Sequence, residues 1–205
     1  MKEYKLPIGC DVPEQLILAD GDFPSHPLAL EWLRQCPYVV CCDGAANTYI
    51  RSGRMPEAIV GDGDSLLPDI KERYASLIHS EAEQETNDLS KAFRFCLSQE
   101  RKRITIMGAT GKREDHTIGN VSLLADYMEQ AEVSMMTDYG IFVPIREDSM
   151  FESYIGQQIS VFNMNSTALS AEGLAYPLSV FTNWWQGTLN EALARHFIIR
   201  TEGKV

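Results

Sequence analysis

Acidic side chains recur in this chain where short apolar runs give way to glycine-rich or polar turns. The five positions are Asp43, Asp62, Asp64, Asp88 and Asp115. Because the turns that follow parallel strands open on one edge of a sheet, we expect these carboxylates to gather in one crevice. Two carboxylates about 4 Å apart repel by roughly 4 kcal/mol at an effective dielectric constant near 20, so their convergence requires a cation or a raised pKa. The pattern therefore predicts a divalent metal ion that carries phosphate.

The composition narrows the class of protein. The 205 residues are 44% hydrophobic and 23% charged, which is typical of a globular protein, and the net charge is -11. We expect no nucleic-acid or anionic-membrane surface, because such a surface carries a basic patch. No apolar run approaches the roughly 20 residues of a membrane span, and the N-terminus has no signal-peptide core. These features predict a cytoplasmic location.

The cysteines are expected to be reduced thiols packed in the core. Their number is odd and no C-x-x-C pair occurs, and two of them are consecutive strand residues that should face opposite sides of a sheet. The five are Cys10, Cys36, Cys41, Cys42 and Cys96.

Strand-like and helix-like patterns alternate over the first two thirds of the chain. One strand is expected over 15–19, ending in Asp20-Gly21-Asp22, and a helix is expected over 27–36. From Asp88 onward, apolar residues recur at helical spacing, which places Asp88 in the first turn of an amphipathic helix. Alternating units of this kind predict an α/β domain over residues 1–131, with a mostly parallel sheet and helices on both faces.

The pattern changes after about residue 131, where short β-like runs are separated by turn residues. We expect residues 132–205 to form a small β-rich domain. A unit of about 70 residues buries only some 60% of its unfolded surface, so it should pack against the first domain or a second subunit. Trp184 and Trp185 are adjacent, and if they lie in a strand only one of them can face the small core.

Several familiar motifs fail on inspection. A calcium loop starting at Asp62 would need glycine at position 67 and glutamate at position 73, where Leu67 and Arg73 stand. A Walker loop ending at Lys112 would need an earlier glycine at Ile106. The segment from Gly61 lacks the third glycine of a dinucleotide fingerprint, and no His and Cys spacing matches a zinc site.

Each remaining element also has an ordinary structural interpretation. Asp43 and Asp62 precede glycine and suit tight turns, and Asp88 with Lys91 suits the exposed start of a helix. Arg113 and Asp115 would by default form a surface ion pair. Their joint placement after successive strands favours a composite site.

In this order, the segments resemble the thiamine pyrophosphokinase (thiamine diphosphokinase) family. Four motifs within about residues 38–125 carry the resemblance, and a weaker match continues through 173–178 and 187–191. The motifs are Asp43-Gly44-Ala45-Ala46-Asn47, Gly61-Asp62-Gly63-Asp64-Ser65, the segment 84–92 and the segment 108–120. The resemblance implies an α/β nucleotide-binding domain followed by a small C-terminal β-sandwich. It also implies a homodimer that transfers the pyrophosphoryl group of ATP to thiamine, with AMP as the second product.

The resemblance also implies roles for individual residues. Asp62 and Asp64 are the first choice as Mg²⁺ ligands, with Asp43 and Asp88 in support, and Asp115 joins them as a catalytic residue. It could accept the thiamine hydroxyl proton or orient Arg113 and His116. The residues implied at the nucleotide are Asn47, Gln84, Lys91, Gly108, Thr110, Gly111, Arg113 and His116. Those implied at thiamine are Tyr176, Asn190 and Trp185.

The chain departs from the family pattern at four positions. Lys112 replaces a usual glycine, Glu83 a common aspartate, Leu189 a usual serine and Ala192 a frequent aromatic residue. The last two lie near Asn190, in the region where the resemblance implies thiamine contacts.

Two alternatives belong to other classes. The segment 59–66 is similar to the aspartyl-phosphate motif of haloacid-dehalogenase-type phosphatases, in which Asp62 would be a nucleophile. The other alternative is a non-catalytic module that binds nucleotide or thiamine.

Overall fold

The computed structural model describes residues 1–7, 11–81, 83 and 85–205. The chain divides into two compact units. The α/β unit is Gly9–Val143, and the β-rich unit joins Met1–Ile8 to Pro144–Val205. The predicted fold class is confirmed, because an α/β unit with a mostly parallel sheet is accompanied by a β-rich unit.

The α/β unit is built on one seven-stranded sheet. Its strands, in spatial order, are β5 (Ile78–Ser80), β4 (Ala58–Gly61), β3 (Val39–Cys42), β2 (Leu16–Leu18), β6 (Arg103–Met107), β7 (Glu132–Met136) and β8 (Ile141–Phe142). All neighbouring strands are parallel except β7 and β8, which are antiparallel. The turns after the parallel strands therefore open on a common edge, as the sequence predicted.

The strand order reverses once. The chain runs outward from β2 through β3 and β4 to β5, and then returns to place β6 on the other side of β2. Ligands of open α/β sheets bind outside the carboxyl ends of the strands where the order reverses. In this sheet that position lies between the turns that follow β2 and β6.

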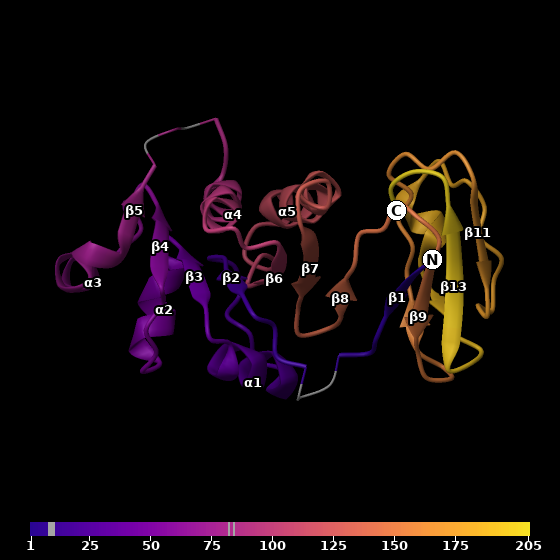
Figure 1. Cartoon of the computed structure of the whole chain (residues 1–205), viewed down its shortest axis with the longest axis horizontal. Coiled ribbons are helices and arrows are strands. Elements are labelled where there is room, and N and C mark those ends of the chain that lie inside the picture. Colours follow the sequence, from indigo (N-terminus) through magenta and orange to yellow (C-terminus); the bar gives the residue numbers. More distant parts are fainter. Residues whose placement is uncertain (8–10, 82, 84) are drawn as a thin grey trace. The chain divides into compact units, whose positions relative to one another are not determined.

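Helices cover both faces of the sheet (Figure 1). They are α1 (Pro27–Gln35), α2 (Ala45–Arg51), α3 (Pro68–Arg73), α4 (Asp88–Ser98) and α5 (Glu114–Tyr127), with a 3-10 turn η1 (Ala75–Leu77). One buried cluster joins α4 and α5 to sheet residues that include Ile17, Val40 and Val60. A second cluster joins α1, α2 and α3 to the alternate strand residues, which face the opposite side of the sheet. Alternation along each strand thus feeds two cores, which is why these strands are apolar throughout.

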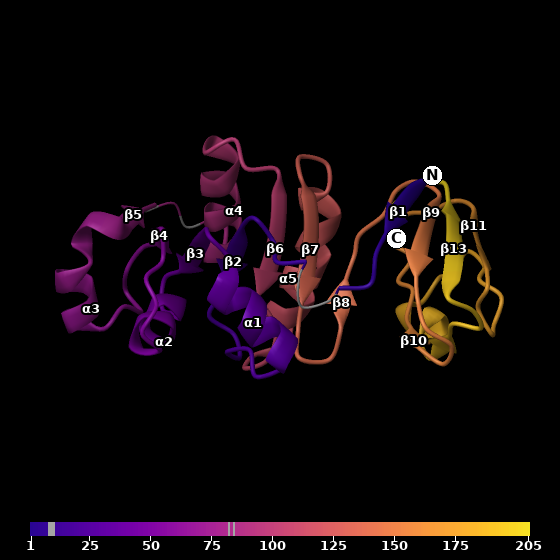
Figure 2. The same ribbon diagram turned by 60° about the horizontal axis from the view of Figure 1, so that its bottom comes forward.

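The β-rich unit holds a four-stranded and a two-stranded sheet. The first has the order β1 (Lys2–Tyr4), β9 (Ser149–Glu152), β13 (His196–Thr201) and β11 (Leu169–Glu172), and the second pairs β10 (Gln158–Ile159) with β12 (Asn190–Glu191) (Figure 2). Stacked rings run across the first sheet, from Tyr4 to Phe151 at 4.8 Å and from Phe151 to Phe197 at 4.9 Å between centroids. These aromatic pairs supply apolar burial that so small a unit needs.

The units divide at different residues from the predicted boundary at 131/132. Strand β1 pairs in parallel with β9, so the first residues join the β-rich unit. Strand β7 pairs with β6, and β8 with β7, so residues 132–142 complete the first sheet. The sequence interpretation ended the first domain where helical periodicity stopped, but these two strands follow the last helix and remain with its sheet.

The four described cysteines, Cys36, Cys41, Cys42 and Cys96, are unpaired. Cys41 and Cys42 lie in different cores on opposite faces of the sheet, as predicted, whereas Cys10 lies outside the described residues. Burial raises the pKa of Cys96 to about 12, so this thiol is protonated at neutral pH. Among the described residues, no helix is long and apolar enough to cross a membrane.

Candidate functional site

Asp43 occupies a strained and buried position directly after β3. Its φ is 32°, a left-handed conformation that aspartate tolerates better than most residues. Its backbone N–H donates to Val60 O at 2.9 Å, and its Oδ2 accepts from the Ser65 N–H at 3.1 Å. The other oxygen, Oδ1, is buried and has no hydrogen-bond partner within the described residues. An unpaired buried carboxylate oxygen is costly unless a cation or another donor approaches it.

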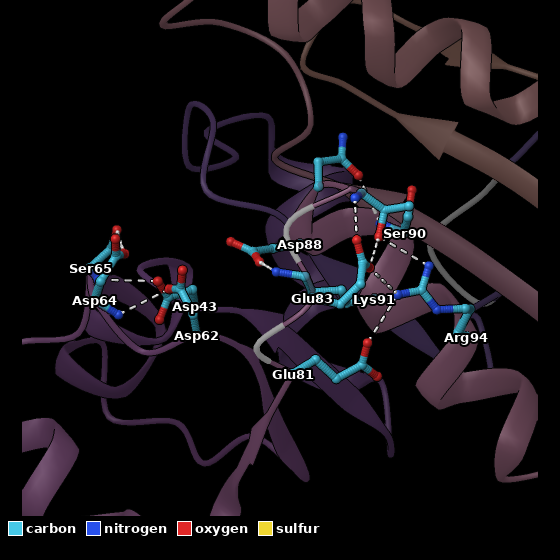
Figure 3. Close-up of polar contacts among 12 residues, drawn as sticks. Asp43, Asp62, Asp64, Ser65, Glu81, Glu83, Asp88, Ser90, Lys91 and Arg94 are labelled. Carbon is cyan, nitrogen blue, oxygen red and sulfur yellow. Dashed lines mark hydrogen bonds and ion pairs between the residues drawn. The ribbon is translucent and has the colours of Figure 1, made fainter.

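Asp62 and Asp64 bring two more carboxylates to the same place from the turn after β4. The Asp62 Oδ1 accepts from the Asp64 N–H at 3.2 Å, and the Ser65 hydroxyl donates to Asp64 Oδ1 at 3.0 Å. One carboxylate oxygen from each of Asp43, Asp62 and Asp64 lies within 4.8 Å of the others (Figure 3). This donor set and the unpaired Asp43 oxygen fit a hard divalent cation, which prefers oxygen ligands.

The turn that carries Asp62 and Asp64 is held by side chains from two helices. Asn47 in α2 donates to Ser65 O at 2.8 Å and accepts from the Leu67 N–H at 3.0 Å. Lys71 in α3 donates to Gly63 O at 2.7 Å. Asn47, which was predicted at the nucleotide, thus fixes the acidic turn through these two backbone contacts.

Asp88 lies beside the cluster, on the other side of Gly61, a glycine that leaves room for Asp43. A Cβ on Gly61 would lie 2.8 Å from Asp43 Cβ and 3.4 Å from Asp88 Cγ. Asp88 begins α4, and the nearly buried Lys91 donates to its Oδ1 at 3.0 Å (Figure 3). Burial opposes the charge of Lys91, but Asp88 and the nearby carboxylates outweigh it and raise the pKa of Lys91. A permanent cation therefore stands next to the acid cluster.

Burial and repulsion within the acid cluster both affect the pKa of Asp43. Burial, and then the charges of Asp88 and Asp62, raise the pKa of Asp43 to about 6. The ordinary value for aspartate is about 3.9, so Asp43 holds its proton more tightly in the folded protein than in the unfolded chain. A bound cation would reverse this effect by favouring the ionised carboxylate.

The chain that enters α4 is anchored by Arg94. Its guanidinium donates to Glu81 Oε2 at 3.0 Å, Glu83 Oε2 at 3.1 Å and Thr86 Oγ1 at 3.1 Å. Glu83 also accepts from the Thr86 N–H at 2.7 Å. Glu83 is thus part of a local network (Figure 3), and the predicted nucleotide residue Gln84 lies outside the described residues.

The glycine-rich turn after β6 pairs with the turn after β2. Gly21 N–H donates to Gly108 O at 2.6 Å, and Asp22 N–H donates to Thr110 O at 2.8 Å. A Cβ on Gly108 would lie 2.5 Å from Ala19 O, so the two turns approach too closely for a side chain there. Asn120 donates to Ala109 O at 2.8 Å and holds the turn from below.

The remaining predicted residues of this turn are exposed. Arg113 precedes α5 and pairs with Asp115 through its Nε at 3.1 Å, and the Asp115 Oδ1 accepts from the His116 N–H at 3.0 Å. Within the described part of the chain, no hydrogen bond or ion pair connects Arg113, Asp115 or His116 to the acid cluster. The structure therefore places them on the same edge without joining them to the three aspartates.

Sequence reasoning left out three residues of this edge. Asp20 and Asp22 were noted only as the end of a strand, and Lys112 only as a departure from a family pattern. Lys112 Nζ donates to Asp20 O at 2.8 Å and to Asp20 Oδ1 at 3.1 Å, which ties the two turns together. Asp20 and Asp22 carried the same signal as Asp62, an acidic turn directly after an apolar strand.

In the β-rich unit, Asn190 organises the backbone of Tyr176. Its side chain accepts from the Tyr176 N–H at 3.0 Å and donates to Tyr176 O at 2.8 Å. The Tyr176 ring is left 65% exposed. Asn190 is itself buried, so its described contacts are structural.

The prediction considered Trp184 and Trp185 as neighbours in a strand, but they do not lie in one. They begin a 3-10 turn, η2 (Trp184–Gly187), which Asn183 and Gln186 cap. Trp184 packs edge-on against Phe162 with the ring centroids 6.0 Å apart, while Trp185 is 73% exposed. Adjacent residues of a 3-10 turn point in different directions, and Trp185 is the more accessible of the two rings.

Comparison with protein families covers almost all of this architecture. The model of the thiamin pyrophosphokinase catalytic domain matches residues 29–136, and the model of the thiamin pyrophosphokinase substrate-binding domain matches residues 140–205. The chain belongs to the thiamin pyrophosphokinase family. The family match argues against the phosphatase alternative. The acid cluster lies in the region matched by the catalytic domain, and Tyr176 lies in the region matched by the substrate-binding domain.

Relatives in the thiamin pyrophosphokinase family match part of the chain. Thiamine pyrophosphokinase 1 of Oryza sativa is 30% identical over 129 residues, covering 51% of this chain and 49% of the relative. Thiamine pyrophosphokinase of Bacillus subtilis is 34% identical over 86 residues, covering 40% of each chain. The matched region spans about half the length of the Oryza sativa relative and 40% of the length of the Bacillus subtilis relative.

Solved structures of thiamine pyrophosphokinases share the fold. The Bacillus subtilis structure has a TM-score of 0.75 at 20% identity and covers 93% of this chain and 95% of that one. The yeast structure has a TM-score of 0.76 at 15% identity, with coverage of 99% and 89%. At these identities the likeness establishes the fold of the chain alone.

We predict that Asp43→Asn stabilises the metal-free protein. Wild-type stability should fall as pH rises from about 4 through 6, because Asp43 loses in that window a proton that the folded state binds more tightly. The variant should be more stable by about 1 to 3 kcal/mol at pH 7, with the difference shrinking toward pH 4. Urea unfolding at both pH values measures this, and an advantage that is equal at pH 4 and pH 7 would contradict the electrostatic origin.

Proposed function

We propose that the chain is a thiamine pyrophosphokinase that transfers the pyrophosphoryl group of ATP to the hydroxyl of thiamine, giving thiamine diphosphate and AMP. The observation that carries the proposal is the convergence of Asp43, Asp62 and Asp64 within 4.8 Å inside a thiamin pyrophosphokinase catalytic domain. Catalysis by a cysteine, as a nucleophile or a redox group, has no comparable support. The buried thiols of Cys42 and Cys96 are protonated. The conclusion is an ATP- and Mg²⁺-dependent transferase.

The acid cluster would hold the metal ion. Asp62 and Asp64 offer accessible oxygens, and the buried Oδ1 of Asp43 lacks another partner within the described residues. When bound there, Mg²⁺ supplies positive charge to the phosphate oxygens and orients them. Asp88 is already engaged by Lys91, so it supports the cluster from the side and keeps that lysine directed toward the site.

Cationic side chains would neutralise the phosphate charge that develops during transfer. Phosphoryl transfer depends mainly on positioning and on charge stabilisation. Lys91 is fixed beside Asp88, and Arg113 is presented before α5 by its pair with Asp115. The Arg113 hydrogen bonds lower the pKa of Asp115, which makes Asp115 a weak proton acceptor and favours the orienting role. His116, Gly108, Thr110 and Gly111 would border the nucleotide on the same edge.

Thiamine recognition would fall to the β-rich unit, which matches the substrate-binding domain of the family. The cationic thiamine ring suits the exposed Tyr176 face, since aromatic rings attract cations through their quadrupole. Trp185 offers a second exposed ring, and Asn190 would position Tyr176 without touching the substrate.

A homodimer would complete this arrangement. The β-rich unit exposes several large apolar side chains. They include Ile155, Trp185, Leu189 and Leu193, each more than half exposed. Burial of this surface between two copies of the chain would supply the partner that the small unit needs.

The reaction itself is the first test. Incubation with ATP, Mg²⁺ and thiamine should yield AMP and thiamine diphosphate in equal amounts, and chromatography of the nucleotide and thiamine products measures both. Without thiamine, AMP should not accumulate. Release of inorganic phosphate with no thiamine diphosphate would refute the proposal, and binding of either substrate without any product would leave a non-catalytic module.

Asp62→Asn and Asp64→Asn should each reduce turnover at least about a hundredfold, because stabilisation by the metal is worth several kcal/mol and each 1.4 kcal/mol changes the rate tenfold. Both variants should remain folded, since they remove like-charge repulsion. Asp69→Asn, which makes the same change on exposed α3, is the matched control. Near-normal turnover of both variants at limiting Mg²⁺ would show that these residues are not the ligands.

Tyr176→Ala should raise the KM for thiamine roughly ten- to a hundredfold, while ATP binding changes little. The backbone at this position should persist, because Asn190 bonds only main-chain atoms of Tyr176. Tyr139→Ala removes a fully exposed tyrosine of the α/β unit and serves as the control.

Shared sites in a dimer can be tested with the same variant. Mixing excess Asp62→Asn protein with Tyr176→Ala protein should restore activity, because each hybrid would contain one site with both intact residues. If subunit exchange is demonstrated and activity stays absent, the shared-site model fails.

A further inference from the structure

A polar hollow lies where the strand order of the α/β sheet reverses. It has a volume of about 210 Å³ and is lined by the turn after β2, by the first turns of α2 and by Lys112 from the turn after β6. Its polar side chains are Asp20, Asp22, Thr48 and Lys112. Open α/β sheets bind ligands at this point of their topology. The acid cluster occupies the neighbouring turns after β3 and β4, so the hollow is a separate compartment of the same edge.

The wall of the hollow is built by close backbone contact. Gly21 N–H and Asp22 N–H both donate across to the turn after β6. Neither Gly21 nor Gly111 has room for a Cβ, since one would collide with the carbonyl oxygens of the facing turn and the other with the Asp22 carboxylate. The Asp22 carboxylate is therefore seated against the Gly111 backbone, and its position depends on that glycine.

The charges of the hollow determine what it can bind. Lys112 donates to both the carboxylate and the carbonyl of Asp20, so these two charges offset each other. Within the part of the chain that the structure describes, the side chains of Asp22 and Thr48 make no hydrogen bond. The available groups are thus one carboxylate acceptor and one hydroxyl, with a net negative charge. A phosphate would be repelled there, whereas neutral hydroxyl groups would find an acceptor.

The hollow adjoins the predicted metal cluster. A Cβ on Gly44, the residue after Asp43, would lie 2.7 Å from Asp20 Oδ2. A nucleotide whose phosphates lie at Asp43, Asp62 and Asp64 would place its next group within reach of this compartment. In a nucleoside triphosphate, the group next to the phosphates is the ribose, which carries two neighbouring hydroxyls.

We propose that the hollow binds the ribose cis-diol of the nucleotide, with the Asp22 carboxylate accepting hydrogen bonds from the 2′- and 3′-hydroxyls and Thr48 contacting the same sugar. The Lys112–Asp20 pair is a positioning element that holds the wall and keeps a second carboxylate from adding charge. An acidic residue on the ribose hydroxyls at a switch point is a solution that other α/β folds use. This inference rests on the proposed function and names the part of its nucleotide that the hollow recognises.

Calorimetric binding of nucleotides in Mg²⁺ tests the inference without turnover. The wild-type protein should bind ATP at least about tenfold more tightly than 2′,3′-dideoxy-ATP, because hydrogen bonds to a charged group are lost. Asp22→Asn should weaken ATP binding about tenfold and leave dideoxy-ATP binding nearly unchanged, so the preference for ribose shrinks. Asp22→Ala should show the same loss of preference with no acceptor left at all.

Controls separate this inference from the proposed function. Asp126→Asn makes the same change on the exposed last turn of α5 and should retain the full preference for ATP. Equal wild-type affinity for ATP and dideoxy-ATP would overturn the inference while leaving the proposed function standing. A preference that persists in Asp22→Asn and Asp22→Ala would overturn it as well. If wild-type protein binds no ATP, the proposed function fails and the inference fails with it.

Discussion

Repulsion among carboxylates that the backbone forces together is the constraint around which the α/β unit is arranged. Asp43, Asp62 and Asp64 have oxygens within 4.8 Å of one another, and one oxygen of Asp43 is buried without a partner among the described residues. The left-handed backbone of Asp43 and the contacts of Asn47 and Lys71 with the acidic turn hold the carboxylates in place. Such strain persists only where surrounding structure over-determines it. A cation would convert this unfavourable arrangement into a favourable one.

Glycines make the crowding sterically feasible. Gly61 leaves room for the Asp43 side chain, and Gly108 lets the turns after β2 and β6 meet. Lys112 has a left-handed φ of 56°, so this chain accepts local strain of about 1 kcal/mol for an ammonium group at that position. The hydrogen bonds from Lys112 to Asp20 offset part of that strain. Backbone geometry and charge placement are therefore set by the same few residues.

The fold class and the three central aspartates could be predicted from sequence because both depend on local patterns. Apolar runs reveal strands, and parallel strands bring their following turns to one edge. Asp20 and Asp22 carried the same local signal as Asp62, but their place beside the turn after β6 depends on β2 pairing with β6, between residues about 90 positions apart. The contacts that Asn47 and Asn190 make with backbone groups were not predicted, because these groups come close only after folding. The 3-10 turn at Trp184 was missed for a different reason, since so short a turn, capped locally by Asn183 and Gln186, has no sequence period.

The pairing of β1 with β9 has a consequence for how the chain is made. Lys2 pairs with Ser149, so one edge strand of the β-rich sheet leaves the ribosome nearly 150 residues before the strand that it pairs with. At roughly 5 to 20 residues per second, that interval lasts about 7 to 30 seconds. The α/β unit between them is then complete and can fold first. The β-rich unit therefore assembles after the α/β unit, around a strand that has waited while nearly 150 further residues were synthesised.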